Sequence, residues 1–210
     1  MNGFSKTNFG VIMKLNEICS SITVGVNKFN EAQEENEALV KMLLLTGQSL
    51  NDKGFIDVNA DTTKTVFIEP ELVEKKKLKS GDVVFLSKGT NLRASIVTEE
   101  QEKLNLLAPA TCLVIKAKLD LVVPEFLTVF LNSDYGQAVL TSLNKGTAIL
   151  NIPVSGLKEI EISVPELVAQ EKLAEVFYKN NQVLSAIEQL KAQQIKVTNA
   201  AYQKLMSEGE

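Results

Sequence analysis

The chain has 210 residues, of which 45% are hydrophobic, and its mean hydropathy of +0.05 is that of a folded protein rather than a disordered or membrane-embedded one. It contains no histidine, which excludes zinc sites built on histidine, Ser-His-Asp nucleophiles and histidine general bases. Its two cysteines, Cys19 and Cys112, are too few for a disulfide framework, so we expect buried thiols, no metal or cofactor and a cytoplasmic location. The apolar runs are too short to cross a bilayer, and residues 1–10 do not resemble a signal peptide.

The net charge is −4, which argues against a protein that coats nucleic acid along its whole surface. The charge is unevenly distributed, because residues 75–93 carry a local balance of +5. The basic residues of this stretch are Lys75, Lys76, Lys77, Lys79, Lys88 and Arg93, and its one acid is Asp82. A locally basic face on an acidic protein can still bind phosphates, so the stretch is a candidate contact to nucleic acid.

The first half of the chain alternates short apolar runs with turn residues, which is typical of small β-sheets. Residues 11–24 predict a short element that turns into a loop, and residues 29–38 predict a solvated acidic segment. Strands are expected at 39–45 and 65–68, with turn residues at 47–54 and an alternating stretch at 55–58 between them. Pro70 ends the second of these strands, and a Gly-Asp turn at 81–82 leads into a strand at 83–86.

The second half adds a helix to the strands. A polar loop is expected at 87–93, strands at 94–98 and 110–118, and a charged connection at 99–103. Pro124 begins a helix, where its missing N–H does no harm, and that helix is expected to continue to about Gly146. An extended segment at 147–154 and a strand at 160–164 follow. The order predicts an α+β domain over residues 1–165, with small β-sheets and a packed helix.

Residues 166–210 predict one long helix of the coiled-coil type. Apolar residues recur there in alternating steps of three and four, which places them on one stripe of the helix. The positions of the stripe are Leu173, Val176, Asn180, Val183, Ile187, Leu190, Gln194, Val197 and Ala201. The segment from Glu166 to Met206 has no Pro or Gly and would measure about 60 Å as a helix. We therefore expect a projecting helix that pairs with a partner helix; the alternative is an amphipathic helix that lies on its own domain.

A set of short motifs occurs in a definite order along nearly the whole chain. Near the amino end are Lys14-Leu-Asn-Glu-Ile18 before Gly25, then Leu78-Lys-Ser-Gly-Asp-Val-Val-Phe85 and Ser87-Lys-Gly89. Further along are Pro124-Glu-Phe-Leu127, Leu131-Asn-Ser133, Lys145-Gly-Thr147 through Ile149, Ile152 and Leu157, Ile160-Glu-Ile-Ser-Val-Pro165 and Gln170-Glu-Lys-Leu-Ala174. In this order the motifs resemble the specificity (S) subunit of type I restriction–modification systems. The resemblance covers nearly the whole chain, but a usual member has two recognition domains and two spacer helices, whereas this chain has one of each.

The resemblance implies a subunit that performs no chemistry. Such a subunit reads one half of a bipartite target in double-stranded DNA and docks methyltransferase (M) subunits, which the restriction (R) subunit then joins. The spacer helices of the family pack antiparallel and set the distance between recognition domains. A half-length chain would satisfy this architecture as a homodimer through its carboxy-terminal helix. Two identical domains related by a two-fold axis would then read an inverted repeat.

Candidate DNA contacts lie in three polar loops. Base edges are read by bidentate donors and acceptors, and phosphates are held by Lys, Arg and hydroxyl groups. The loop at 87–93 supplies Lys88, Thr90, Asn91 and Arg93, with Gly89 allowing close approach of the backbone; the loop at 144–147 supplies Lys145 and Thr147; the loop at 47–54 supplies Gln48 and Asn51. Each glycine and asparagine is also a common turn residue, and each lysine a common solvated one.

Two other functions are open alternatives. One is a coiled-coil adaptor of the same complex that binds protein and reads no DNA, which the acidic net charge favours. The other is a methyltransferase, for which the nearest motif is Asn151-Ile-Pro-Val154. Amino-methyltransferases use an Asn-Pro-Pro-aromatic tetrapeptide, so Ile152 and the missing aromatic argue against it. A glycine-rich loop for the cofactor is also missing, and we disfavour this alternative.

Overall fold

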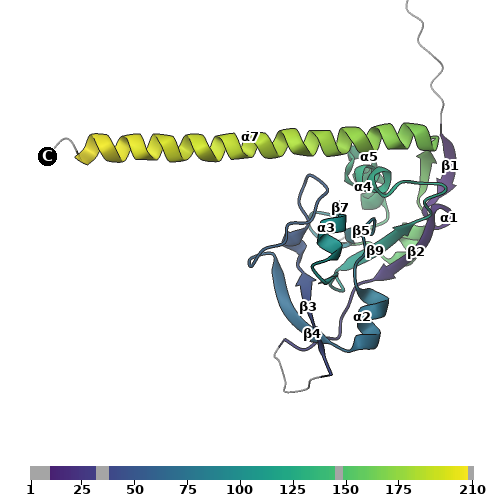
Figure 1. The fold of residues 1–210 in the computed structure, drawn as a ribbon. Helices are drawn as coiled ribbons and strands as arrows, with labels where there is room; N and C mark the ends of the chain where they lie inside the picture. Colours follow the sequence, from purple (N-terminus) through teal and green to yellow (C-terminus); the bar gives the residue numbers. More distant parts are fainter. Residues whose placement is uncertain (1–9, 32–37, 145–148, 208–210) are drawn as a thin grey trace, which may run out of the picture.

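The computed structural model describes residues 10–31, 38–144 and 149–207. Figure 1 shows a mixed α+β domain crossed on one side by a long helix, which confirms the expected fold class. The strands are β1 (Val11–Lys14), β2 (Cys19–Val24), β3 (Val40–Leu45), β4 (Thr63–Ile68), β5 (Val83–Leu86), β6 (Lys88–Gly89), β7 (Arg93–Ile96), β8 (Leu106–Leu107), β9 (Cys112–Ala117), β10 (Leu150–Asn151) and β11 (Glu161–Val164). The helices are α1 (Leu15–Ile18), α2 (Pro70–Lys76), α3 (Glu99–Glu102), α4 (Pro124–Asn132), α5 (Asp134–Ser142), α6 (Val154–Lys158) and α7 (Leu167–Ser207), with a 3₁₀ turn η1 (Gly47–Ser49).

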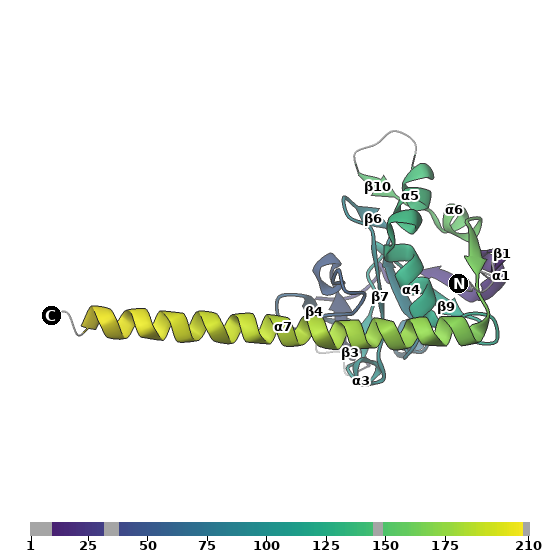
Figure 2. The same cartoon turned by 90° about the horizontal axis from the view of Figure 1, so that it is seen from above.

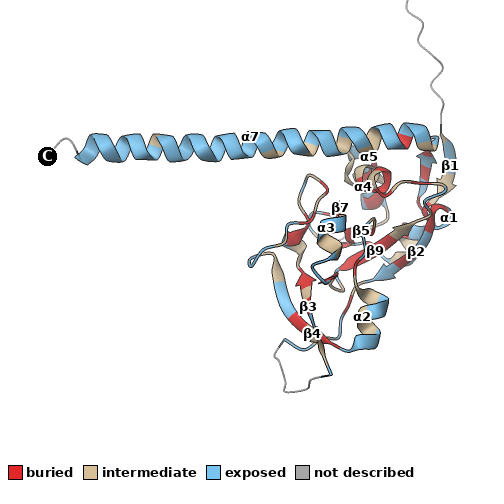
Figure 3. Cartoon of the chain, in the orientation of Figure 1, coloured by how far each residue is buried: buried red, intermediate tan, exposed pale blue. Residues whose placement is uncertain are grey.

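The central sheet has the antiparallel order β2-β9-β5-β7 and separates two hydrophobic clusters. Alternate residues of a strand point to opposite faces, so Val83 and Phe85 of β5 enter the cluster beneath α4, while Val84 and Leu86 enter the other. Cys112 and Cys19 are both buried, as the sequence predicts. Burial raises the pKa of each thiol to about 12, so both stay protonated at neutral pH. Figure 3 shows that the buried residues are concentrated in the α+β domain and are almost lacking in α7.

A second sheet, of order β4-β3-β8, lies beside the first and carries α2. Strands β3 and β4 pair over their full length, from Val40 opposite Ile68 to Leu45 opposite Thr63. Met42, Leu44 and Val66 form a third cluster, against which Leu72 of α2 packs. Pro70 was expected only to end a strand, but it also begins α2, and proline at the first position of a helix is a common start signal.

The first and last strands of the domain pair next to the amino-terminal end of α7. Strand β1 pairs antiparallel with β11, so that Val11 lies opposite Val164, three residues before α7 begins. The expectation of one short element and a loop at 11–24 was wrong, because the segment forms β1, the turn-long helix α1 and β2. The partners of β1 and β2 are β11 and β9, about 90 residues away or more, and their pairing leaves no local signal.

The helix expected from Pro124 to about Gly146 is in fact two helices. Ser133 is extended (φ −70°, ψ 154°) and ends α4, and its hydroxyl oxygen then accepts a hydrogen bond from the N–H of Gly136 as the cap of α5. The expected extended segment at 147–154 is also only partly right, because Val154 begins the short helix α6. Ile152 is buried in the first cluster, so the tetrapeptide Asn151–Val154 serves packing.

Candidate nucleic-acid interface and helical arm

Four of the predicted DNA-contacting residues line one hollow. It has a volume of about 440 Å³ and lies where η1 meets the segment between β6 and β7. Gln48, Thr90 and Asn91 are exposed in it, and Arg93 is half-buried at its wall. The remaining lining residues are Thr46, Gly47, Asp61, Lys64, Leu86 and Gly89. The structure thus brings together residues from two segments about 40 positions apart that the sequence could only name separately.

The antiparallel pairing of β5 with β7 positions this segment. Leu86 lies opposite Arg93, and Leu92 is buried in the first cluster, which fixes the end of the loop. Gly89 has a φ of +146°, a conformation that side-chain-bearing residues rarely adopt, and no atom lies within 4 Å of where its Cβ would be. The glycine is therefore required by its backbone conformation rather than by packing, and its backbone is open to approach.

Arg93 is held by contacts that the sequence did not reveal. Its Nη1 donates to Oδ1 of Asp52 at 3.2 Å, and its buried Nε has no hydrogen-bond partner among the described residues. The next residue, Ala94, is bonded twice by Asn132 at the end of α4: the Ala94 N–H donates to Oδ1, and Nδ2 donates to the Ala94 carbonyl, both at 2.8 Å. Asn132 thus acts on β7 as a neighbouring strand would and fixes the backbone next to Arg93.

Two of the other predicted contacts, Asn51 and Lys88, do not line the hollow. Oδ1 of Asn51 accepts from the N–H groups of Lys53 and Phe55, and its Nδ2 donates to Asp57, so this side chain is occupied in shaping its own turn. Lys88 is exposed, and its strand β6 pairs with β10. Lys145 and Thr147 lie outside the described residues.

Two lysines of the basic stretch at 75–93 form hydrogen bonds within the chain. Lys76 donates to the Val24 carbonyl and Lys77 to Oδ1 of Asn105, each at 2.7 Å. Asp82 forms an ion pair with Lys116, which lies outside the stretch. These contacts give Lys76 and Lys77 partners within the chain, and phosphate binding by the basic stretch stays a prediction.

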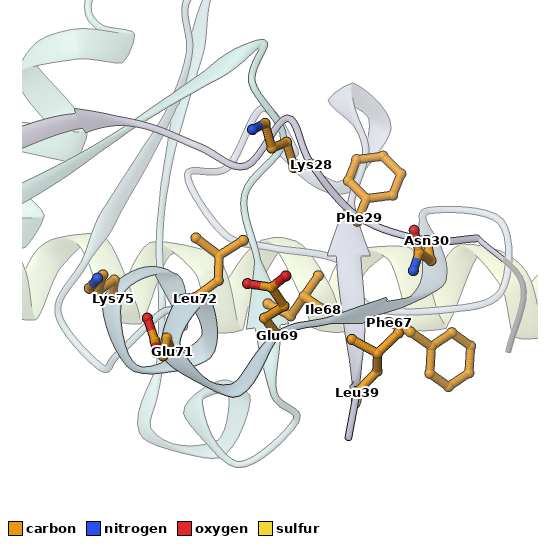
Figure 4. A pocket seen from close by; sticks show the side chains of 10 residues that line it. All are labelled: Lys28, Phe29, Asn30, Leu39, Phe67, Ile68, Glu69, Glu71, Leu72 and Lys75. Carbon is orange, nitrogen blue, oxygen red and sulfur yellow. The ribbon is translucent and has the colours of Figure 1, made fainter. Parts of the chain in front are cut away.

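A second hollow lies between α2 and the edge of the β3–β4 sheet and has a volume of about 370 Å³ (Figure 4). Apolar side chains dominate it, among them Phe29 and Leu72, and two lysines and two glutamates stand at its rim. Glu69 and Glu71 would repel phosphates, so we do not assign nucleic-acid contact to this hollow.

Helix α7 is fastened to its domain by a buried glutamine. Gln170 has no exposed surface. Its Oε1 accepts from the Val123 N–H at 3.0 Å, and its Nε2 donates to the carbonyls of Leu121 and Pro165 at 3.1 and 2.7 Å. Val123 is the residue before α4, so this one amide joins the start of α7 to the start of α4.

A second attachment lies further along α7. The ring of Phe177 stacks on Phe55 with centroids 4.7 Å apart, and Nζ of Lys53 contacts Oε2 of Glu188 at 2.6 Å. Between them, Gly54 has a φ of +82°, and a Cβ there would lie 2.9 Å from the Phe177 ring. The loop that carries Asp52 is therefore packed directly against α7.

The heptad stripe of α7 is largely uncovered. Val176, Val183, Ile187, Leu190 and Val197 are between 55% and 66% exposed, and Asn180 and Gln194 are exposed as well. Leu173 differs, because it packs against the chain's own first cluster. The alternative of a helix lying on its own domain thus describes the first half of α7, while Figures 1 and 2 show the second half projecting past the domain.

The described residues offer neither a metal site nor a membrane span. They contain no group of three or more Cys, Asp or Glu side chains arranged to hold a metal ion. Within the same part of the chain, no helix is both long and apolar enough to cross a membrane; the 41 residues of α7 are too polar.

Comparison with known proteins identifies the family. Curated proteins include no match to this chain. A chain from a structure of the assembly and conformational transition of the type I R-M system is similar over 92% of this chain and 47% of its own length (TM-score 0.60, 16% identity). The HsdS subunit from Thermoanaerobacter tengcongensis is similar over 93% and 47% (TM-score 0.58, 16% identity), so this chain spans about half of each. The model of the type I restriction modification DNA specificity domain matches residues 11–197, and the chain therefore belongs to that family.

Proposed function

We propose that this chain reads one half of a bipartite target in double-stranded DNA, as the recognition component of a type I restriction–modification system. The observation that carries the proposal is the hollow, which gathers Gln48, Thr90, Asn91 and Arg93 in a member of a DNA specificity family. Amide side chains can pair with adenine and an arginine with guanine, so this set suits base edges as well as phosphates. Lys88, Asn51, Lys145 and Thr147 stay predicted contacts with less support.

The roles of the two segments of this chain and of its partner subunits follow from the family. Residues 1–165 form the reading domain, and residues 166–210 form the spacer. The chain performs no chemistry and needs no cofactor; M subunits supply adenine methylation, and an R subunit joins through them. The site of action is the cytoplasm, where the DNA is. An adaptor without DNA reading is not favoured, because the matched family is one of DNA specificity domains.

The uncovered stripe of α7 supports pairing of two copies. Five apolar side chains that are more than half exposed are unusual on a helix without a partner, since burying each would contribute about 1 kcal/mol or more. A second copy offers the same stripe, and a two-fold pair buries both at once. Identical domains at the two ends of the pair would then read an inverted repeat.

The experiment that tests DNA reading uses the chain reconstituted with the M subunit of its own system. Genomic DNA fragments are incubated with the complex, and retained fragments are sequenced. We expect enrichment of fragments that share an inverted repeat. Arg93→Ala should lower retention of those fragments about tenfold, from the loss of one base contact. Lys158→Ala, an equal change of charge on the exposed end of α6, is the matched control and should leave retention unchanged. Unselective retention by the unmodified complex would contradict the proposal.

A further inference from the structure

Two residues of opposite charge stand together beside the hollow, and one of them was not expected from the sequence. Arg93 lies on β7, and Asp52 lies in the loop between η1 and β4, with Nη1 and Oδ1 3.2 Å apart. We infer that this pair reads a single G·C base pair in each half-site. The inference rests on the proposed function and names the base pair that the pair of side chains recognises.

The burial of Arg93 limits how it can bind. Its side chain is 27% exposed, and its Nε is buried without a hydrogen-bond partner among the described residues. Recognition through Nε is therefore blocked. One N–H of Nη1 is used by Asp52, so the other N–H of Nη1 and the two N–H groups of Nη2 are the donors left for a ligand. In the major groove, guanine presents two neighbouring acceptors, N7 and O6, which match two parallel N–H donors.

Asp52 is poorly placed for a phosphate contact but well placed for a base contact. Its carboxylate is 94% exposed, and a negative charge beside Arg93 weakens the attraction of that arginine for phosphate. An arginine that only gripped the backbone would bind better without it. Cytosine, in contrast, presents its N4 amino group next to guanine O6, and a carboxylate accepts from that donor. Adenine and thymine present a different order of groups, so arginine and aspartate together match G·C.

The backbones that carry the two residues are both anchored. Arg93 precedes Ala94, whose N–H and carbonyl are both bonded to Asn132. Asp52 follows Asn51, whose side chain accepts two backbone hydrogen bonds at 3.0 Å, and precedes Phe55, which stacks on Phe177 of α7. Base reading needs side chains held within a fraction of an ångström, and this support meets that need.

The test is a selection from a pool of duplex DNA with randomised positions, using the chain reconstituted with the M subunit of its own system. The unmodified complex should enrich sequences that contain a G·C pair at one fixed position in each half-site. Asp52→Ala and Arg93→Lys should each lower the selectivity at that position roughly tenfold and leave the other positions unchanged. Asp120→Ala is the matched control, because Asp120 is an exposed aspartate like Asp52 but does not line the hollow.

Two results would overturn the inference while leaving the proposed function intact. One is an Asp52→Ala complex that enriches the same DNA sequences as the unmodified complex and changes its affinity equally for all of them. Asp52 would then act only through its charge. The other is a loss of selectivity at a position that is not G·C. An unmodified complex that enriches no sequence would overturn the proposed function and the inference together.

Discussion

Between Leu167 and Glu188, α7 lies along its own domain, whereas beyond Glu188 it extends past that domain (Figures 1 and 2). The first half contributes Gln170 and Phe177 to contacts with the domain, and from Ala186 to Ser207 every residue except Thr198 is exposed. The heptad pattern nevertheless runs unchanged through both halves. A partner helix that contacts both halves of α7 would explain why the heptad pattern continues where the domain ends.

The two attachments of the first half determine the direction of the second. Gln170 fixes the start of α7, and Phe177 with Glu188 fixes it about 10 to 27 Å further along, at about 1.5 Å per residue. A helix held at two separated points has a defined angle to its domain. The distance between two reading domains in a pair would therefore depend on these contacts as well as on helix length.

The largest effect is expected in the uncovered stripe. Ile187→Glu with Leu190→Glu would place unpaired charges between two helices, at a cost of about 3–5 kcal/mol for each buried charge. We expect sedimentation to show a dimer for the unmodified chain and a monomer for the double variant. Gln182→Glu with Gln189→Glu changes the charge equally on the opposite side of α7 and should stay dimeric. A double variant that remains dimeric would mean that the stripe is not the interface.

The next effect concerns the attachment at the start of α7. Gln170→Ala would leave the Val123 N–H and two carbonyls without their partner in a buried site, which should lower the free energy of unfolding by about 3–5 kcal/mol. Urea denaturation followed by circular dichroism measures this loss. Gln182→Ala, in an exposed position, should cost less than about 0.5 kcal/mol. Equal stabilities of the two variants would show that Gln170 does not fasten the helix.

A smaller effect separates the two halves directly. Phe177→Ala removes a ring that stacks on Phe55 and should destabilise the monomer by about 2–3 kcal/mol, measured by urea denaturation at a concentration where the chain is monomeric. Val197→Ala, in the projecting half, should leave monomer stability within about 0.5 kcal/mol and weaken only self-association. Equal destabilisation of the monomer by both variants would show that the two halves of α7 do not differ in their contacts to the domain.

The smallest effect is that of the ion pair between Lys53 and Glu188. Because the Glu188 side chain is 64% exposed, the pair should contribute about 0.2–1 kcal/mol, and less at high salt. A double-mutant cycle with Lys53→Met and Glu188→Gln measures the coupling between the two side chains. A coupling of zero would leave Phe177 and Tyr178, which contact Phe55 and Glu125, to fix the direction of α7.

The sequence predicted elements whose signal is local and missed those whose partners are distant. Strand β5 was predicted with its correct bounds and α7 to within a few residues, because alternation and heptad spacing are visible in a short window. Strand β2 was missed because it is formed by pairing with β9, about 90 residues away. In α4, the break at Ser133 depends on a single capping side chain in an otherwise continuous helical pattern.

The candidate site shows the same division. Gln48, Thr90, Asn91 and Arg93 were chosen for their chemistry, and the fold brings them to one hollow. Asp52 and Asn132 were missed, because their importance comes from contacts to β7 across about 40 positions of sequence. Asn51 stays a prediction with less support, because a turn asparagine that bonds its own backbone has the same sequence signature as one that reads a base.

The most direct test of the central claim is a map of methylated adenines in cells that express the system with the unmodified chain or with Arg93→Ala. We expect methylation at one inverted-repeat target with the unmodified chain. We also expect Arg93→Ala to reduce methylation at that target or to relax the sequence requirement at one of its positions. Methylation at the same sites and to the same extent with both chains would contradict the claim that this hollow reads DNA.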